Sequence, residues 1–349
     1  MTRVSRPLAL LVLAAITVVS CTRLGSSSSN AQLADIVAAG PTVSDVRSML
    51  GDSNWWQGPP TFEVRPLNAE TTPRAVRFGM TQQFIHIGTA EGFLVHYTVY
   101  ETTTAATTRM TNLPNQLGPA QATSPKVGDQ VMYYGETGPS GAPYLARTFV
   151  RLGEIIVEVT WARKDGVASL TQLGKNASKI VDGLKKAIAA KTHRSLQVVD
   201  QKLLPPPELD ITFLGAAPLP IEAFLVMGDY AIPGPLAKEL HGHGVDTFVF
   251  GDYVLNGDTH MEVQAALMTF ASHADATGWL GAYSGGQPDQ SGVVSSYLDA
   301  IGKYRYSFTS GVYGAMLVCR STVPGEAASR ACEQPLSRTV ISWGQGLAG

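Results

Sequence analysis

The sequence has few cysteines, a low density of charge and no N-terminal apolar run long enough to span a bilayer. Three cysteines occur in 349 residues, and Asp, Glu, Lys and Arg together make up 15% of the chain. The apolar run Leu8 to Val19 would cover about 18 Å as a helix, well short of the ~30 Å hydrocarbon core. A permanent transmembrane helix is therefore disfavoured at this position.

Recognisable catalytic motifs are also lacking. Gly138 to Ala142 ends in alanine where the G-x-S-x-G nucleophile elbow needs glycine, and no S-x-x-K motif occurs. H-E-x-x-H and P-loop patterns are absent as well. No run of Lys and Arg forms a phosphate-binding stripe, since the densest basic stretch, Lys175 to Arg194, alternates with apolar residues in a helical pattern. The sequence predicts a protein that is not an enzyme, has no cofactor and binds no nucleic acid.

The first thirty residues have the layout of an export signal. Arg3 and Arg6 precede the apolar run, which ends in the small residue Ser20 before Cys21. Removing residues 1–20 takes away two of 26 basic residues and none of 28 acidic ones, so the remaining chain has a net charge of −4. Residues 21–31, with Gly25, four serines and Asn30, predict a flexible tether.

The segment Val18-Val19-Ser20-Cys21 resembles the lipobox of bacterial lipoproteins, in which a branched apolar residue and a small residue precede an invariant cysteine. The resemblance covers about the first twenty-one residues and no part of the later domains. It implies a signal peptide at 1–20, diacylglycerol and acyl chains such as palmitate on Cys21, and a lipid-anchored protein on the extracytoplasmic face of the cell membrane, or at the outer membrane in a Gram-negative envelope. The alternative is an ordinary secretory signal that leaves Cys21 as a free thiol.

Once Cys21 is set aside, only Cys319 and Cys332 remain. Two cysteines in an exported protein favour a disulfide bond, and two unpaired buried thiols are the alternative.

A proline-rich segment predicts the boundary between two domains. Pro205, Pro206 and Pro207 follow a lysine- and alanine-rich helical stretch, and three consecutive prolines cannot continue a helix. We predict a first domain over 32–198, a linker over 199–208 and a second domain over 203–349.

Each half shows strand pairs alternating with helices, which predicts an α+β fold with antiparallel sheets and helices packed on one face. The predicted strands are 93–100, 144–153, 154–162, 261–270, 304–308 and 312–319, and the predicted helices are 102–113, 169–190, 272–280 and about 335–347. Shifting the chain by 170 positions aligns Tyr100 with Phe270 and Met110 with Leu280 without a gap. The two domains are therefore candidates for an old duplication, with chance similarity as the alternative.

Two groups of residues are candidate sites. His241 and His243, two positions apart, could gather with His260 as metal ligands if a hairpin folds the chain back, although the spacing matches no tight metal motif and favours a glycine-rich loop between a helix ending at Leu240 and a strand from Thr247. Trp55 and Trp56 lie in a segment rich in turn residues, which predicts a loop whose indoles contact a ligand or partner, or plug the edge of the core.

The sequence favours a lipid-anchored, non-catalytic binding or interaction module of the cell envelope. Its predicted partners are the membrane, through the acyl chains on Cys21, and an envelope protein or ligand that the sequence does not identify. The alternative is an envelope metal-binding protein or metal-dependent enzyme that uses His241, His243 and His260. A solute-binding component of a transporter fits the strand pattern poorly because it would need larger α/β lobes.

Overall fold

The structure is a computed structural model whose described residues form two compact units, one before and one after the segment 191–199. The described ranges are 31–64, 76–89, 91–122, 124–137, 142–190, 200–206, 210–228, 233–283, 293–298, 302–323 and 326–348.

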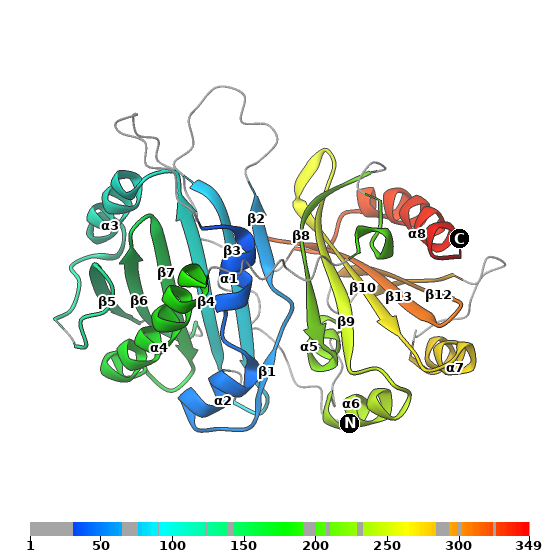
Figure 1. Cartoon of the computed structure of the whole chain (residues 1–349), viewed down its shortest axis with the longest axis horizontal. Helices are drawn as coiled ribbons and strands as arrows, with labels where there is room; N and C mark the ends of the chain where they lie inside the picture. The colour runs from blue at the N-terminus through cyan, green and yellow to red at the C-terminus, as the bar shows by residue number, and fades with distance from the viewer. Residues whose placement is uncertain are drawn as a thin grey trace. The chain divides into compact units, whose positions relative to one another are not determined.

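The first unit is an antiparallel sheet with four helices (Figure 1). The strands run in the order β1-β3-β4-β7-β6-β5, and β2 also pairs with β3. Its elements are α1 (Leu33–Ala39), α2 (Val43–Leu50), β1 (Trp55–Gln57), β2 (Thr61–Val64), β3 (Val76–His86), β4 (Gly92–Tyr100), α3 (Thr103–Leu117), β5 (Gln130–Glu136), β6 (Tyr144–Leu152), β7 (Ile155–Arg163) and α4 (Leu170–Ala189).

The two faces of this sheet differ because side chains alternate along each strand. On β4, Phe93, Val95, Tyr97 and Val99 are all fully buried on one face. The same face carries Tyr133 of β5, which lies against Gly174 of α4: a Cβ on that glycine would be 2.7 Å from the Tyr133 hydroxyl oxygen. Helix α4 therefore covers the apolar face, and α1 packs beside it.

Helix α3 packs on the opposite face and covers only one end of it. Its buried residues Ala106, Met110 and Leu113 contact a cluster on the sheet formed by Tyr100, Tyr134, Phe149 and Ile156. The helix begins after Thr102, whose hydroxyl accepts a hydrogen bond from the backbone N–H of Ala105 at 3.1 Å.

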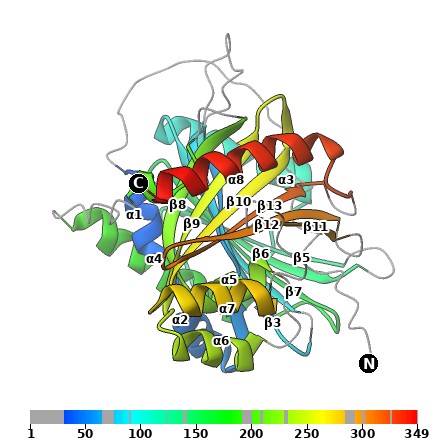
Figure 2. The ribbon, with the colours of Figure 1, turned by 90° about the vertical axis from the view of Figure 1, so that its right-hand side faces the viewer.

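The second unit is a six-stranded antiparallel sheet in the order β11-β12-β13-β10-β9-β8. Figure 2 shows its strands between α8 and α7. Its elements are a 3₁₀ turn η1 (Gln201–Leu203), β8 (Ile211–Pro220), α5 (Ile221–Met227), α6 (Pro233–Gly242), β9 (Thr247–Leu255), β10 (Asp258–Thr269), α7 (His273–Tyr283), β11 (Val294–Leu298), β12 (Lys303–Ser310), β13 (Tyr313–Ser321), η2 (Arg330–Cys332) and α8 (Glu333–Ala348).

The two units have the same topology. Apart from β1 and β2 of the first sheet and β8 of the second, the order β3-β4-β7-β6-β5 corresponds to β9-β10-β13-β12-β11, with α3 matching α7 and α4 matching α8. The backbone N–H of Tyr100 donates to the carbonyl of Glu154, in the turn between β6 and β7, at 2.9 Å. The backbone N–H of Phe270 donates to the carbonyl of Val312, in the turn between β12 and β13, also at 2.9 Å. The predicted shift of 170 positions thus pairs residues with equivalent backbone contacts. A common origin of the units stays a prediction.

The predicted α+β class with two antiparallel sheets is confirmed, and its strands and helices lie within a few residues of the predicted ranges. The helices, however, are distributed over both faces of each sheet. In the second unit Leu336, Val340 and Trp343 of α8 pack on one face. Trp279 of α7 packs on the other face, where it contacts Phe270 and Phe224. Phe224 in turn contacts Phe248.

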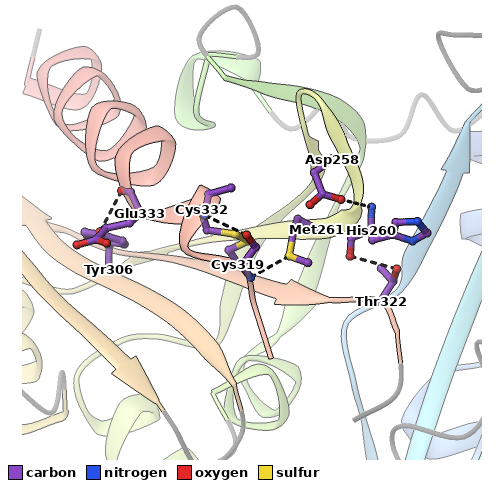
Figure 3. The surroundings of a disulfide bond; sticks show 10 residues. Asp258, His260, Met261, Tyr306, Cys319, Thr322, Cys332 and Glu333 are labelled. Atoms are coloured by element: carbon purple, nitrogen blue, oxygen red, sulfur yellow. Dashed lines mark hydrogen bonds between the residues drawn. A yellow bond between two sulfur atoms is a disulfide. The ribbon is translucent and has the colours of Figure 1, made fainter. Parts of the chain in front are cut away.

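Cys319 of β13 and Cys332 of η2 form a disulfide bond across a sequence separation of 13 (Figure 3). Both are fully buried in the core that α8 covers. Close by, the Tyr306 hydroxyl donates a hydrogen bond to the Glu333 carbonyl at 3.1 Å, which holds the first turn of α8 against β12. The expected pairing is therefore present.

The described part of the predicted linker, residues 200–206, is packed onto the second unit. Leu204 is buried, and the Tyr253 hydroxyl donates to the Pro205 carbonyl at 3.0 Å. The indole N–H of Trp343 donates to the Leu203 carbonyl at 2.9 Å. These residues thus belong structurally to the second unit.

Replacing both cysteines, as Cys319→Ala with Cys332→Ala, should lower the free energy of unfolding by about 3 kcal/mol, because the covalent loop no longer restricts the unfolded chain. Denaturant titration of both proteins measures the difference. Wild-type protein reduced after unfolding should refold with the lower stability of the variant. An unchanged midpoint would show that the disulfide contributes nothing to the stability of this unit.

Candidate binding face

Polar side chains gather on the face of the first sheet that α3 leaves uncovered. They alternate along the strands with the residues of the apolar face, so that His96 and Thr98 follow Val95 and Tyr97. This polar face consists of Glu63, Thr81, Gln83, His96, Thr98, Glu136, Arg147, Glu158 and Thr160. Six strands contribute to this continuous surface: β2, which carries Glu63, and β3 to β7.

His96 is held by hydroxyl groups on both sides of its ring. Its Nδ1 lies 2.7 Å from the Thr81 hydroxyl, and its Nε2 lies 2.8 Å from that of Thr98. A carboxylate oxygen of Glu63 is 3.8 Å from Nδ1. Because these partners come from β2, β3 and β4, the ring orientation is fixed by the sheet and needs no ligand.

Arg147 lies between two carboxylates. Its guanidinium is 3.5 Å from Glu136 and 3.8 Å from Glu158, and the Thr160 hydroxyl donates to Glu158 at 3.1 Å. The Arg147 side chain is 14% exposed, whereas Glu136 and Glu158 are 31% and 25% exposed. At these distances neither ion pair is a full hydrogen bond, and among the described residues the buried Arg147 Nε and one buried oxygen of Glu136 have no hydrogen-bond partner.

Tyr100 marks the boundary between the polar face and α3. Burial raises the pKa of its hydroxyl to about 12, although Arg109 of α3 opposes the shift, and the charges of Glu63 and Glu158 add to it. Tyr100 is thus a neutral hydrogen-bonding group at physiological pH, and α3 forms one wall of the polar face.

The second sheet has polar residues on its corresponding face, more deeply buried. Arg320 forms an ion pair with Glu262, and the side-chain amide of Gln264 donates to Glu262 at 3.2 Å. Burial opposes ionisation of Glu262, but the charge and hydrogen bond of Arg320, together with side-chain hydrogen bonds shared with Asp252 and Gln264, lower its pKa below the ordinary value. Glu262 is 4% exposed and Asp252 is fully buried.

The three histidines considered as metal ligands have separate environments. His241, in the last turn of α6, lies 2.8 Å from Asp246 and 3.6 Å from Glu222. His243 lies 2.7 Å from Asp275. His260 lies on β10, where its carbonyl accepts a hydrogen bond from Thr322 (Figure 3).

Among the residues that the structure describes, no group of three or more His, Cys, Asp or Glu side chains could hold a metal ion. His241 lies beside two carboxylates, Asp246 and Glu222, and His243 lies beside one, Asp275.

The prediction that Trp55 and Trp56 lie in a loop is wrong. Both belong to β1, which pairs with the end of β3. Trp55 is 2% exposed and packs edge-on against His86 and Phe93, so it closes the edge of the core. Trp56 is half-buried on the other side of the strand, with the Arg47 guanidinium over its ring at 5.5 Å. Only Trp56 presents an accessible indole.

Cys21 and the predicted signal lie outside the described residues. Within the described part of the chain, no helix combines the length and apolar character that crossing a bilayer requires.

No family model and no curated protein matches the chain. Among solved structures, the extracellular domain of PknH from Mycobacterium tuberculosis aligns with 46% of this chain and 100% of its own length, at 15% sequence identity and a TM-score of 0.32. A TM-score this low supports no inference about the chain.

The polar face was not predicted from the sequence. Its signal is the alternation in Val95-His-Tyr-Thr-Val99, where polar residues occupy every second position of an otherwise apolar strand. A strand buried on both faces would not carry them.

The ion pair in the second sheet predicts a specific dependence of stability on pH. Because the pKa of Glu262 is lowered on folding, its contribution is complete above the ordinary value of 4.5 and is lost as the pH falls through the lower folded value. Between about pH 5 and pH 3, the free energy of unfolding of wild type should therefore fall more steeply than that of Glu262→Gln.

Denaturant titrations at several pH values measure both slopes. The double variant Glu262→Gln with Arg320→Met should share the shallower slope, since neither charge remains, and it should be more stable than Glu262→Gln alone. Identical slopes in wild type and Glu262→Gln would contradict the assigned role of the carboxylate.

Proposed function

We propose that the chain is a lipid-anchored, extracytoplasmic lipoprotein that acts as a non-catalytic binding module of the cell envelope. The observation that carries the proposal is the polar face of the first sheet, where Arg147 and Glu158 present charged groups from rigid strands and His96 orients the hydroxyls of Thr81 and Thr98. Side chains held on strands lose little conformational freedom when a ligand or partner binds.

The location rests on two independent features. Residues 1–21 have the layout of an export signal with a lipobox, which would place acyl chains on Cys21. The buried disulfide between Cys319 and Cys332 fits an oxidising compartment, because disulfides persist mainly outside the cytosol.

The chemistry of the polar face favours binding over catalysis. A hydrolase of the usual type needs a nucleophile beside a base that a third group orients. His96 instead has a threonine hydroxyl at each ring nitrogen, and no Ser or Cys side chain among the described residues is bonded to it. Threonine hydroxyls on both nitrogens fit a histidine that positions neighbouring groups.

The alternatives fit less well. A metal-dependent role has no ligand cluster among the described residues. A transporter-type solute-binding protein would have parallel sheets with crossover helices, whereas every strand pair described in these two units is antiparallel.

The lipid anchor predicts a defined effect of one substitution. Cys21→Ala should leave the signal uncleaved and abolish incorporation of labelled fatty acid, because the sulfur that carries the lipid is absent. Metabolic labelling with an alkyne-tagged palmitate and the mass of the purified chain measure both. Ser20→Ala, which keeps a small residue before the cysteine, is the control and should be processed and labelled normally. Labelling of Cys21→Ala, or normal cleavage without label in wild type, would contradict the anchor.

The binding role predicts that contacts depend on the polar face. The variant His96→Ala with Glu63→Gln should lose at least one species that wild type forms after chemical cross-linking in intact cells, because it removes hydrogen-bonding groups without changing the apolar core. Trp56→Ala tests the edge of the same sheet separately.

Lys126→Ala with Lys164→Ala, two exposed positions of the same unit, is the matched control and should retain every cross-linked species. Thermal unfolding confirms that each variant is folded. A folded His96→Ala with Glu63→Gln variant that keeps the full set of species would show that another surface makes the contacts.

A further inference from the structure

Helix α4 carries a basic stripe on its solvent side. Lys175, Lys179 and Lys186 are exposed and lie at spacings of four and seven residues, which places them on one line along the helix. Lys185 flanks the line with its side chain 50% exposed. The buried residues of α4, among them Leu173, Ala177 and Leu184, occupy the opposite side against the sheet.

Only one acidic residue interrupts this stripe. Asp182 lies 3.8 Å from Lys185, and both side chains are well exposed, so the pair is weak. With four lysines and one aspartate, α4 has a charge of +3, whereas the chain without residues 1–20 has −4. The remainder of that chain therefore carries −7, and α4 is a local exception to an acidic protein.

The fold does not require this charge. Helix α8 has the same place in the second unit but contains no lysine. Its exposed positions include Ser337, Ile341 and Gln345, and its one arginine, Arg338, lies 2.9 Å from Asp210. Two helices with the same packing task thus differ in the charge they present to solvent.

The basic stripe lies close to where the chain emerges from the N-terminal segment. Helix α1, the first described helix, packs against α4, and a Cβ on Gly183 would be 3.4 Å from the Ala39 carbonyl oxygen. Ten residues separate Cys21 from Gln32, and such a segment spans at most about 36 Å. Helix α4 has 20 residues and is about 30 Å long. An anchor at Cys21 therefore keeps α4 within about one helix length of the bilayer.

We infer that the lysine stripe of α4, formed by Lys175, Lys179, Lys185 and Lys186, docks on the anionic headgroups of the membrane that holds the lipid anchor. The orientation rests on the proposed anchor, but the affinity for anionic lipid belongs to the stripe itself. Each lysine near an anionic surface adds to the attraction, and four together are enough to orient a tethered domain.

The test separates the stripe from the anchor. The chain from residue 21 onward, with Cys21→Ser, is mixed with phosphatidylcholine vesicles that contain either no phosphatidylglycerol or about a third, and the bound fraction is measured by flotation. We expect binding only to the anionic vesicles, with a loss of binding as salt shortens the range of the attraction.

The variant with Lys175→Gln, Lys179→Gln, Lys185→Gln and Lys186→Gln should bind at least tenfold more weakly than wild type. Glutamine keeps a helix propensity close to that of lysine, and circular dichroism checks the fold. The matched control changes four exposed lysines elsewhere, Lys126, Lys164, Lys202 and Lys238, to glutamine and so removes the same total charge. It should bind like wild type. Asp182→Asn should bind more tightly than wild type.

Equal binding by the stripe variant and wild type would overturn the inference, as would equal losses in the two lysine variants or equal binding to uncharged vesicles. If Cys21 is not acylated but binding to anionic vesicles is intact, the proposed lipid anchor is contradicted and the inference about the lysine stripe is supported.

Discussion

The alternation of side chains along the central strand pair of each sheet is the constraint on which the rest of the structure depends. On β4, every second side chain from Phe93 to Val99 is fully buried. Because β7 pairs with β4 in register, its Val157 and Val159 join the same core. A register shift of one residue would move His96 and Glu158 into the core and the valines to the other face. The long terminal helix of each unit packs against the face that this register defines.

The same alternation explains how much of the fold could be predicted from the sequence. Strands such as 93–100 and helices such as 169–190 have strong periodicity, and caps such as Thr102 mark where a helix begins. Trp55 and Trp56 have turn residues on both sides, a pattern that predicts a loop. They form a strand because the end of β3 supplies backbone partners that no local pattern reveals. Tertiary pairing overrides local propensity at such short segments.

The candidate site was less predictable because its residues come from strands far apart in the sequence. Glu63 lies on β2 and Glu158 lies on β7. These strands are far apart in the sequence, and the strand order β3-β4-β7-β6, with β2 beside β3, brings both residues to one sheet. Such a surface lowers the stability of the fold, because partly buried charges lose hydration that their ion pairs only partly replace. In the second unit, Glu262 is almost fully buried and has Arg320 as its counter-charge. In the first, Arg147 shares two carboxylates at 3.5 and 3.8 Å, so its environment is less complete. This difference makes the first sheet the better candidate for binding.

The two units show how one topology can serve different tasks through residues that do not affect folding. Helices α4 and α8 each cover an apolar sheet face, and each does so with a stripe of buried aliphatic side chains. The solvent side of such a helix is free of that requirement, because surface substitutions change stability little. Folding therefore does not set the difference between the four lysines of α4 and the single arginine of α8, which pairs with Asp210. A basic helix beside the chain's entry point and a polar face on the opposite side of the same sheet place the two proposed contacts on different surfaces. A membrane held by α4 would leave that polar face unobstructed by the bilayer, since the sheet itself lies between them.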